Sequence, residues 1–75
     1  MNLYALFGTE IATGIISLLG IFDTQSGAVQ ASATLPPGQY NAFHVSTYVL
    51  NQLKVTFEPH EILHITPEVL ALHLV

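Results

Sequence analysis

A run of twenty residues near the start of the chain constrains its fold more than any other feature. Residues 3–22 are almost all apolar or small, and Glu10 is their one charged side chain. With the period of an α-helix, the large apolar residues of this run fall along one broad stripe, and the polar stretch 23–27 then ends it. We therefore predict an apolar N-terminal helix over residues 1–22. The stripe consists of Leu3, Phe7, Ile11, Ile15, Leu18, Leu19 and Phe22.

The length of this run also raises the question of a membrane span. A helix of twenty residues is about 30 Å long, which is the thickness of the hydrocarbon core of a bilayer. Against a span stand Glu10 near the middle of the run and the lack of Lys or Arg beside it. We favour a helix buried between protein surfaces and keep a single membrane span over residues 3–22 as the alternative.

The composition limits the possible functions. The chain has 75 residues, of which 51% are hydrophobic and 8% are charged, so it forms one small domain with too few charges to cover its apolar residues. An exposed apolar patch that meets a protein partner is expected. Lys54 is the one basic residue and the net charge is −4, which excludes nucleic acid as a partner. There is no cysteine, hence no disulfide or thiolate site.

From residue 28 onward the pattern predicts strands. Small or apolar residues alternate with polar ones over residues 29–35, and β-branched and aromatic residues are frequent over residues 39–50 and 53–58. A further short strand is expected over residues 61–65. A tight turn at Asn51 and Gln52 would join the two middle strands into a hairpin, although a longer loop with another register stays open.

The tight hairpin also predicts the two faces of the sheet. Leu50 would lie opposite Leu53, Tyr48 opposite Val55 and Ser46 opposite Phe57 on the core side. The other face would then meet a partner; it carries Phe43, Val45 and Val49, with Thr47, Lys54, Thr56, Glu58 and His60.

A helix signal lies near the C-terminal end. Thr66 suits the N-cap, Pro67 the first helical position and Glu68 the first turn. Residues 69–75 are thus expected to form a helix, with a strand as the alternative. The predicted fold class is α+β, with the N-terminal helix, an antiparallel sheet of three to four strands and a short C-terminal helix or strand. The β-rich part, residues 23–75, would fold as one unit with the helix.

One string resembles a catalytic motif. His60, Glu61 and His64 match the pattern in which a helix presents two histidines to zinc. Here the string lies between Pro59 and Pro67, which leaves at most about two helical turns. On a strand the two histidines would be about 13 Å apart. We therefore expect no catalytic residue, metal or cofactor; His60 and His64 are the metal candidates of the least favoured alternative, a zinc-dependent hydrolase.

These features favour a non-enzymatic structural subunit that buries apolar surface against protein neighbours in a homo- or hetero-oligomer. A minor capsid, cement or tail component of a virion, or a small subunit of another large complex, would suit the composition, with a membrane location second. The expected interface residues are Leu3, Phe7, Ile11, Ile15, Leu19, Phe22, Phe43, Val45 and Val49.

Overall fold

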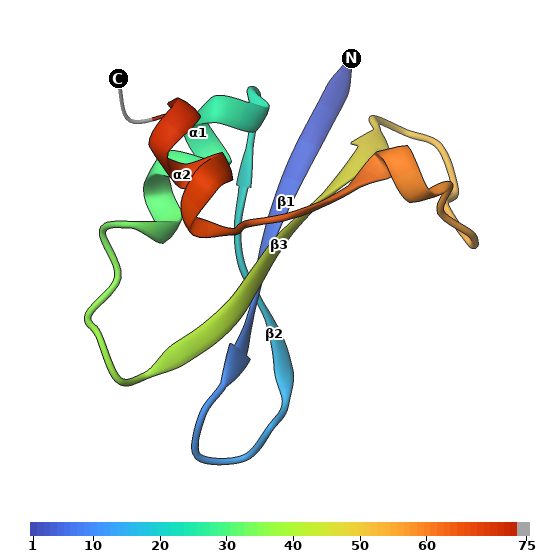
Figure 1. The fold of residues 1–75 in the computed structure, drawn as a ribbon. Coiled ribbons are helices and arrows are strands. Elements are labelled where there is room, and N and C mark those ends of the chain that lie inside the picture. The colour runs from blue at the N-terminus through green and yellow to red at the C-terminus, as the bar shows by residue number, and fades with distance from the viewer. Residues whose placement is uncertain (74–75) are drawn as a thin grey trace.

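The computed structural model of the chain describes residues 1–73. Its elements follow in the order β1 (Asn2–Glu10), β2 (Ile16–Phe22), α1 (Gln25–Ser32), β3 (Tyr40–Val49), the 3-10 helix η1 (Pro59–Glu61), β4 (Ile62–His64) and α2 (Pro67–His73). The four strands form one antiparallel sheet, and α1 and α2 lie next to each other on one side of it (Figure 1). The molecule therefore has two layers, one of strands and one of short helices.

The order of strands in the sheet is β2-β1-β3-β4. β1 lies inside the sheet, where Leu6 pairs with Gly20 of β2 and with Val45 of β3. Each of these two ladders contains an irregularity, since β2 and β3 both carry one extra residue relative to β1. Ala42 lies at the second irregularity and has a φ of 50°. Such bulges increase the local twist of a sheet, and the strands cross visibly in Figure 1.

The predicted N-terminal helix is wrong, because the apolar run forms the β1–β2 hairpin. At its turn the Glu10 N–H donates to the Ile15 carbonyl and the Gly14 N–H donates to the Glu10 carbonyl, both at 2.8 Å. Gly14 has a φ of 73°, a conformation that glycine adopts without steric cost. The Thr13 hydroxyl accepts a hydrogen bond from the Ile15 N–H at 3.2 Å. The charge in the middle of the run is thus placed at a turn.

The strand predicted over residues 29–35 is also wrong, because this region belongs mainly to α1. Thr24 is the N-cap, and its hydroxyl accepts a hydrogen bond from the Gly27 N–H at 3.0 Å. Ala28, Val29 and Ser32 of α1 are buried against the sheet, which is the spacing of one helix face. Two of the four residues that alternate with polar ones, Ala31 and Ala33, are alanines, and alanine is the strongest helix former.

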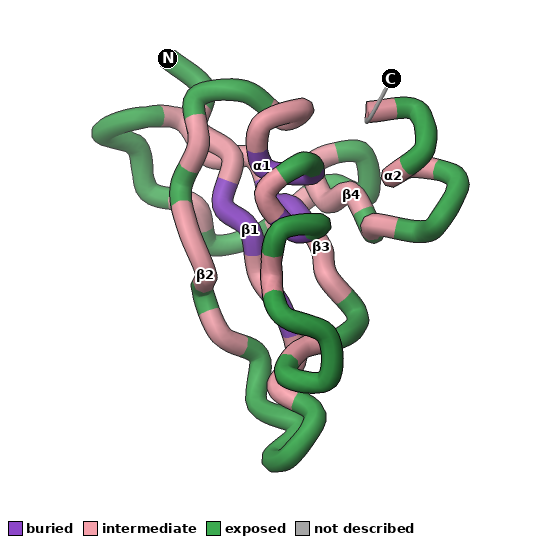
Figure 2. The backbone as a smooth tube through the Cα atoms, turned by 90° about the vertical axis from the view of Figure 1, so that its left-hand side faces the viewer, coloured by how far each residue is buried: buried purple, intermediate pink, exposed green. Residues whose placement is uncertain are grey.

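The core lies between the helices and one face of the sheet. Its fully buried residues are Leu6, Ala28, Val29 and Val45. Figure 2 shows that the buried segments lie in α1 and in the two inner strands, β1 and β3. The core is small because the helices cover one face of the sheet and leave the other face open.

In the second half of the chain, some of the predicted strands are confirmed. The strand expected over residues 39–50 forms as β3, and the one expected over residues 61–65 forms as β4. The strand predicted over residues 53–58 is wrong, since this stretch has no regular structure. β4 takes its place beside β3, with Ser46 opposite Ile62 instead of Phe57. Leu53 and Val55 are consequently 97% and 89% exposed.

The helix predicted after residue 65 is confirmed over the described residues, where α2 covers Pro67–His73. The Thr66 hydroxyl accepts a hydrogen bond from the Val69 N–H at 3.2 Å, as expected of an N-cap. The Gln30 side chain of α1 donates to the His73 carbonyl at 2.7 Å and so joins the two helices. The last two residues of the predicted helix, 74 and 75, lie outside the described residues.

Candidate interaction surface

The face of the sheet opposite the helices is largely apolar, and among residues 1–73 only the stretch after β3 lies over it, at one end. We call it the open face; it carries Leu3, Ala5, Phe7, Ile16, Leu18, Ile21, His44, Ser46, Tyr48, Ile62 and His64, as the strand registers require. Leu18 is 54% exposed and Ile21 is 60% exposed. Isolated exposed apolar residues are ordinary, but a contiguous group on one face marks an interaction site.

The open face is hollowed near the end of β3. The hollow has a volume of about 270 Å³ and is lined by Leu3, Ala5, Phe7, Leu18, Ile21, Tyr48, Val49, Leu50 and Asn51. Leu50 closes this end because its N–H donates to the Met1 carbonyl at 2.9 Å, which fixes the chain after β3 to the start of β1. Nearly the whole lining is hydrocarbon or aromatic, so the hollow fits an apolar side chain.

The expected interface residues do not share one surface. Leu3 and Phe7 lie on the open face, and Val49 lines its hollow. Ile11 and Ile15 are exposed in the turn between β1 and β2. The other four lie on the helix-covered side in or against the protein's own core; they are Leu19, Phe22, Phe43 and Val45.

The faces of β3 are the reverse of the predicted ones. The side with Phe43 and Val45 was expected to meet a partner, but it packs against the core. Tyr48, expected in the core, lies on the open face instead. The reason is that the helices supply the apolar cover and settle on the face of β3 where Val45 pairs with Leu63.

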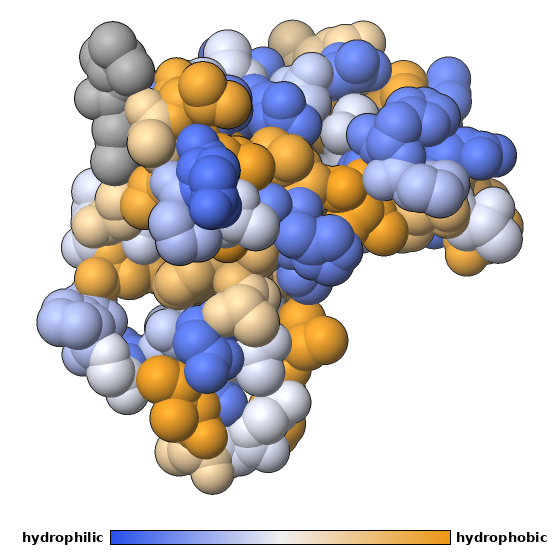
Figure 3. Space-filling model, in the orientation of Figure 1, coloured by the Kyte–Doolittle hydropathy of each residue, from blue (hydrophilic) through white to orange (hydrophobic). Residues whose placement is uncertain are grey.

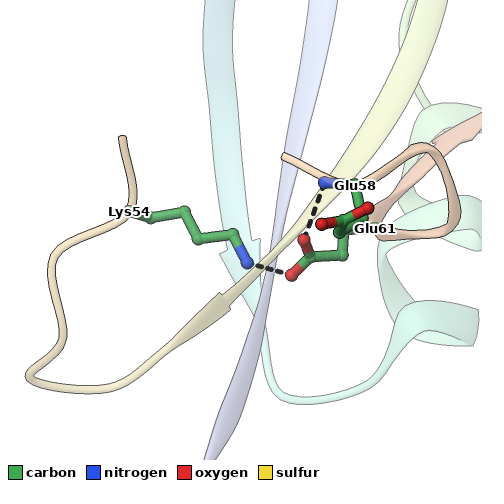
Figure 4. A network of polar contacts seen from close by, with 3 residues as sticks. All are labelled: Lys54, Glu58 and Glu61. Carbon is green, nitrogen blue, oxygen red and sulfur yellow. Dashed lines mark hydrogen bonds and ion pairs between the residues drawn. The ribbon is translucent and has the colours of Figure 1, made fainter. Parts of the chain in front are cut away.

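The segment after β3 is held over the end of this face by one polar network. Lys54 forms an ion pair with Glu61, and the second carboxylate oxygen of Glu61 accepts the Glu58 N–H at 2.8 Å (Figure 4). The Lys54 ammonium lies 5.3 Å from the centre of the Phe57 ring, which meets Tyr48 edge-to-face at 5.2 Å. The hydrogen bond from Lys54, followed by that from the Glu58 N–H, lowers the pKa of Glu61 from its ordinary value of 4.5.

This network also places the hydrophilic residues of the segment away from the helices. Figure 1 shows the stretch between β3 and β4 projecting to the side opposite α1 and α2. In Figure 3 the hydrophilic residues gather at its end, and apolar residues fill the space between it and the helices. The open face is therefore flanked by a projection that carries hydrophilic residues together with the exposed Leu53 and Val55.

The string His60, Glu61 and His64 lacks the helix that a zinc hydrolase needs. His60 and Glu61 belong to η1 and His64 ends β4. Glu61 is engaged by Lys54, so its carboxylate is not placed to activate water. Among residues 1–73 no group of three or more His, Asp or Glu side chains is arranged to hold a metal ion.

His64 instead faces a histidine that the sequence did not indicate. His44 and His64 are direct partners in the β3–β4 ladder, and their ring centres are 6.0 Å apart. Phe7 stacks on the other side of the His44 ring at 5.1 Å with an interplanar angle of 9°. Burial, with the neighbouring His64 as the second cause, lowers the pKa of His44 from its ordinary value of 6.5, so that His44 is neutral at pH 7.

Comparison of the chain with protein-family models, curated proteins and solved structures found no match. None of the helices within residues 1–73 is both long enough and apolar enough to span a bilayer.

Proposed function

We propose that this protein is a non-enzymatic structural subunit that associates with a second copy of itself through the open face. The observation that carries the proposal is the apolar hollow and the exposed apolar side chains around it, Leu18, Ile21 and Leu50. Two sheets that pack face to face lie about 10 Å apart and bury their inner side chains between them. A second copy would therefore give the open face the cover that the helices give the other face.

The surface area supports an association of this kind. The chain exposes 5063 Å². A folded monomer of 8.1 kDa is expected to expose about 4,500 Å² on the general scaling of area with mass. The excess is of the same order as the roughly 800 Å² that each partner loses in a standard interface.

The distribution of charge supports an identical partner over a charged one. None of the open-face residues is acidic or basic, apart from the two histidines. The carboxylates lie elsewhere: Glu10 at the turn after β1, Asp23 after β2, Glu58 and Glu61 around η1, and Glu68 in α2. Two copies that met through the open face would place no carboxylate against another, despite the net charge of −4.

The size of the protein in solution tests this proposal. We expect sedimentation velocity or light scattering to give about twice the monomer mass at micromolar concentration, and Ile21→Lys to give the monomer. Burying an unpaired ammonium in an apolar interface is unfavourable, whereas Ile21 is 60% exposed in the single chain, so the fold tolerates the change.

The matched control is Leu72→Lys. Leu72 of α2 is 78% exposed and lies away from the open face, so this variant should remain a dimer. A wild-type protein that is monomeric at all concentrations would contradict the proposal. So would a dimer that Leu72→Lys dissociates and Ile21→Lys does not.

Association through the open face would also suit a subunit of a larger assembly, such as a virion. In such an assembly the contact between two copies would be one of several contacts. Co-purification of the protein with assembled particles would support this wider form of the proposal. Recovery of the dimer free of particles under all conditions of assembly would oppose it.

A further inference from the structure

We propose that His44 and His64 form a binding site for a divalent transition metal ion that prefers imidazole ligands, with Zn²⁺ as its representative. The two side chains come from different strands, 20 positions apart in the sequence, and the β3–β4 register places them directly opposite each other. Both ligands come from one chain, so their bonds to the ion need no second copy, although both lie on the open face that the proposed dimer would cover.

His44 and His64 form a non-hydrogen-bonded pair, the kind of antiparallel pair in which the two side chains lie closest together. The Ile65 N–H donates to the Phe43 carbonyl at 3.0 Å, so the hydrogen bonds of the ladder flank the pair of histidines instead of joining it. In such non-hydrogen-bonded pairs the Cα atoms are about 4.5 Å apart and the side chains are closest. The strands thus bring the two imidazoles within reach of one ion.

The ring geometry suits shared coordination. A zinc ion bound to two imidazoles at about 2.0–2.1 Å, with a tetrahedral angle between them, needs nitrogen atoms about 3.4 Å apart. The ring centres are 6.0 Å apart with an interplanar angle of 48°. Phe7 limits the movement of the His44 ring by stacking on it, so the exposed His64 side chain is the one that would rotate to bring a nitrogen of each ring to this distance.

The chemical state of the ligands also suits a metal. None of the hydrogen bonds among residues 1–73 involves either imidazole, so no group of these residues occupies the nitrogen lone pairs. A histidine must be neutral to bind a metal, and the low pKa of His44 keeps it neutral at pH 7. Two ligands leave the remaining positions of the ion for water or for groups of another molecule.

Zinc titration of the wild-type protein, followed through the imidazole resonances, provides the first test. The chain has four histidines, so His60 and His73 act as internal controls in the same sample. We expect the resonances of His44 and His64 to shift or broaden together at substoichiometric zinc, and those of the other two to follow only at excess. No change in the His44 and His64 resonances would overturn the proposal.

Variants provide the second test. With each of His44→Gln and His64→Gln, loss of one ligand removes the chelate, so we expect zinc affinity to fall by about tenfold or more. His60→Gln and His73→Gln should leave it unchanged. If His60→Gln weakens binding as much as His64→Gln, the metal is bound by the sequence-local pair and our assignment is wrong. Calorimetry at pH 7 measures these affinities, and circular dichroism checks that each variant is folded.

Discussion

The ion pair between Lys54 and Glu61 is the centre of a small network of contacts. The carboxylate accepts from the Lys54 ammonium and from the Glu58 N–H, and the ammonium lies over the face of Phe57. These contacts join the irregular stretch after β3 to η1. Both side chains are only 19% exposed, so the ion pair fixes the path of the segment.

Acid should weaken this segment in a way that can be assigned to Glu61. Its pKa is lowered in the folded protein, so its contribution to stability is present above about 4.5 and is lost as the pH falls through the folded value. We expect the melting temperature of the wild type to fall more steeply below pH 4.5 than that of Glu61→Gln.

Lys54→Gln is the matched control, because it removes the first cause of the shift and leaves the carboxylate in place. Its melting temperature should depend on pH less steeply than that of the wild type. Parallel curves for the wild type and both variants would show that Glu61 titrates alike in the folded and unfolded chains.

Single residues also show where sequence reasoning reaches its limit. The string His60, Glu61 and His64 was visible because its members are neighbours in the sequence, and the prolines around it argued correctly against a long helix. The pairing of His44 with His64 depends on the β3–β4 register. That register could not be derived, because the predicted strand over residues 53–58 occupied the place of β4.

Among the elements, the N-terminal hairpin gives the clearest reason for a wrong prediction. A strand that is apolar on both faces lacks the polar alternation that identifies strands, and its residues then match a helical stripe as well. Two signals within the run could have revealed the turn. Glu10 would be costly inside a buried helix, and Gly14 supplies the positive φ that the hairpin turn uses.

A substitution at Gly14 tests this explanation. With a φ of 73° and no atom within 4 Å of an added Cβ, Gly14→Ala is unfavourable through backbone conformation alone. We expect it to lower the free energy of unfolding by about 1 kcal/mol, measured by urea denaturation. Gly14→Asn should cost less, because asparagine tolerates this conformation better. Equal losses in the two variants would mean that the side chain itself is not accommodated at the turn.

The elements after the hairpin were predicted well where a local signal specified them. Thr66 and Pro67 predict α2, and the β-branched and aromatic residues predict β3. The cap of α1 is equally local, since Thr24 is followed by a run rich in alanine, but the alternation of residues 29–35 matches a strand as well. The stretch 53–58 has strand-forming residues and no partner strand among the described residues, which shows that β propensity depends on pairing.

At the scale of the whole molecule, the main property is that the helix layer covers only one face of the sheet. Two short helices cover one face of a four-stranded sheet, and the open face keeps exposed side chains such as Leu18 and Ile21. The expectation of an exposed apolar patch followed from the composition alone. Its position did not, because the patch is built from four strands whose order is a property of the fold.

The position of Lys54 has a practical consequence for proteolysis. Trypsin cleaves after lysine and arginine, and the sequence contains one such residue, so the 75 residues hold a single tryptic bond, between Lys54 and Val55. Val55 is 89% exposed, yet the Lys54 side chain, which the protease must bind, is held by Glu61 and lies mostly buried at 19% exposure.

Cleavage therefore requires the ion pair to open first, and its rate measures how often this happens. We expect mass spectrometry to find slow conversion of the wild type into two fragments and faster conversion of Glu61→Gln under the same conditions. Glu68→Gln, with a carboxylate outside the network, is the control and should be cut at the wild-type rate. Equal rates for the wild type and Glu61→Gln would show that the ion pair does not protect the bond.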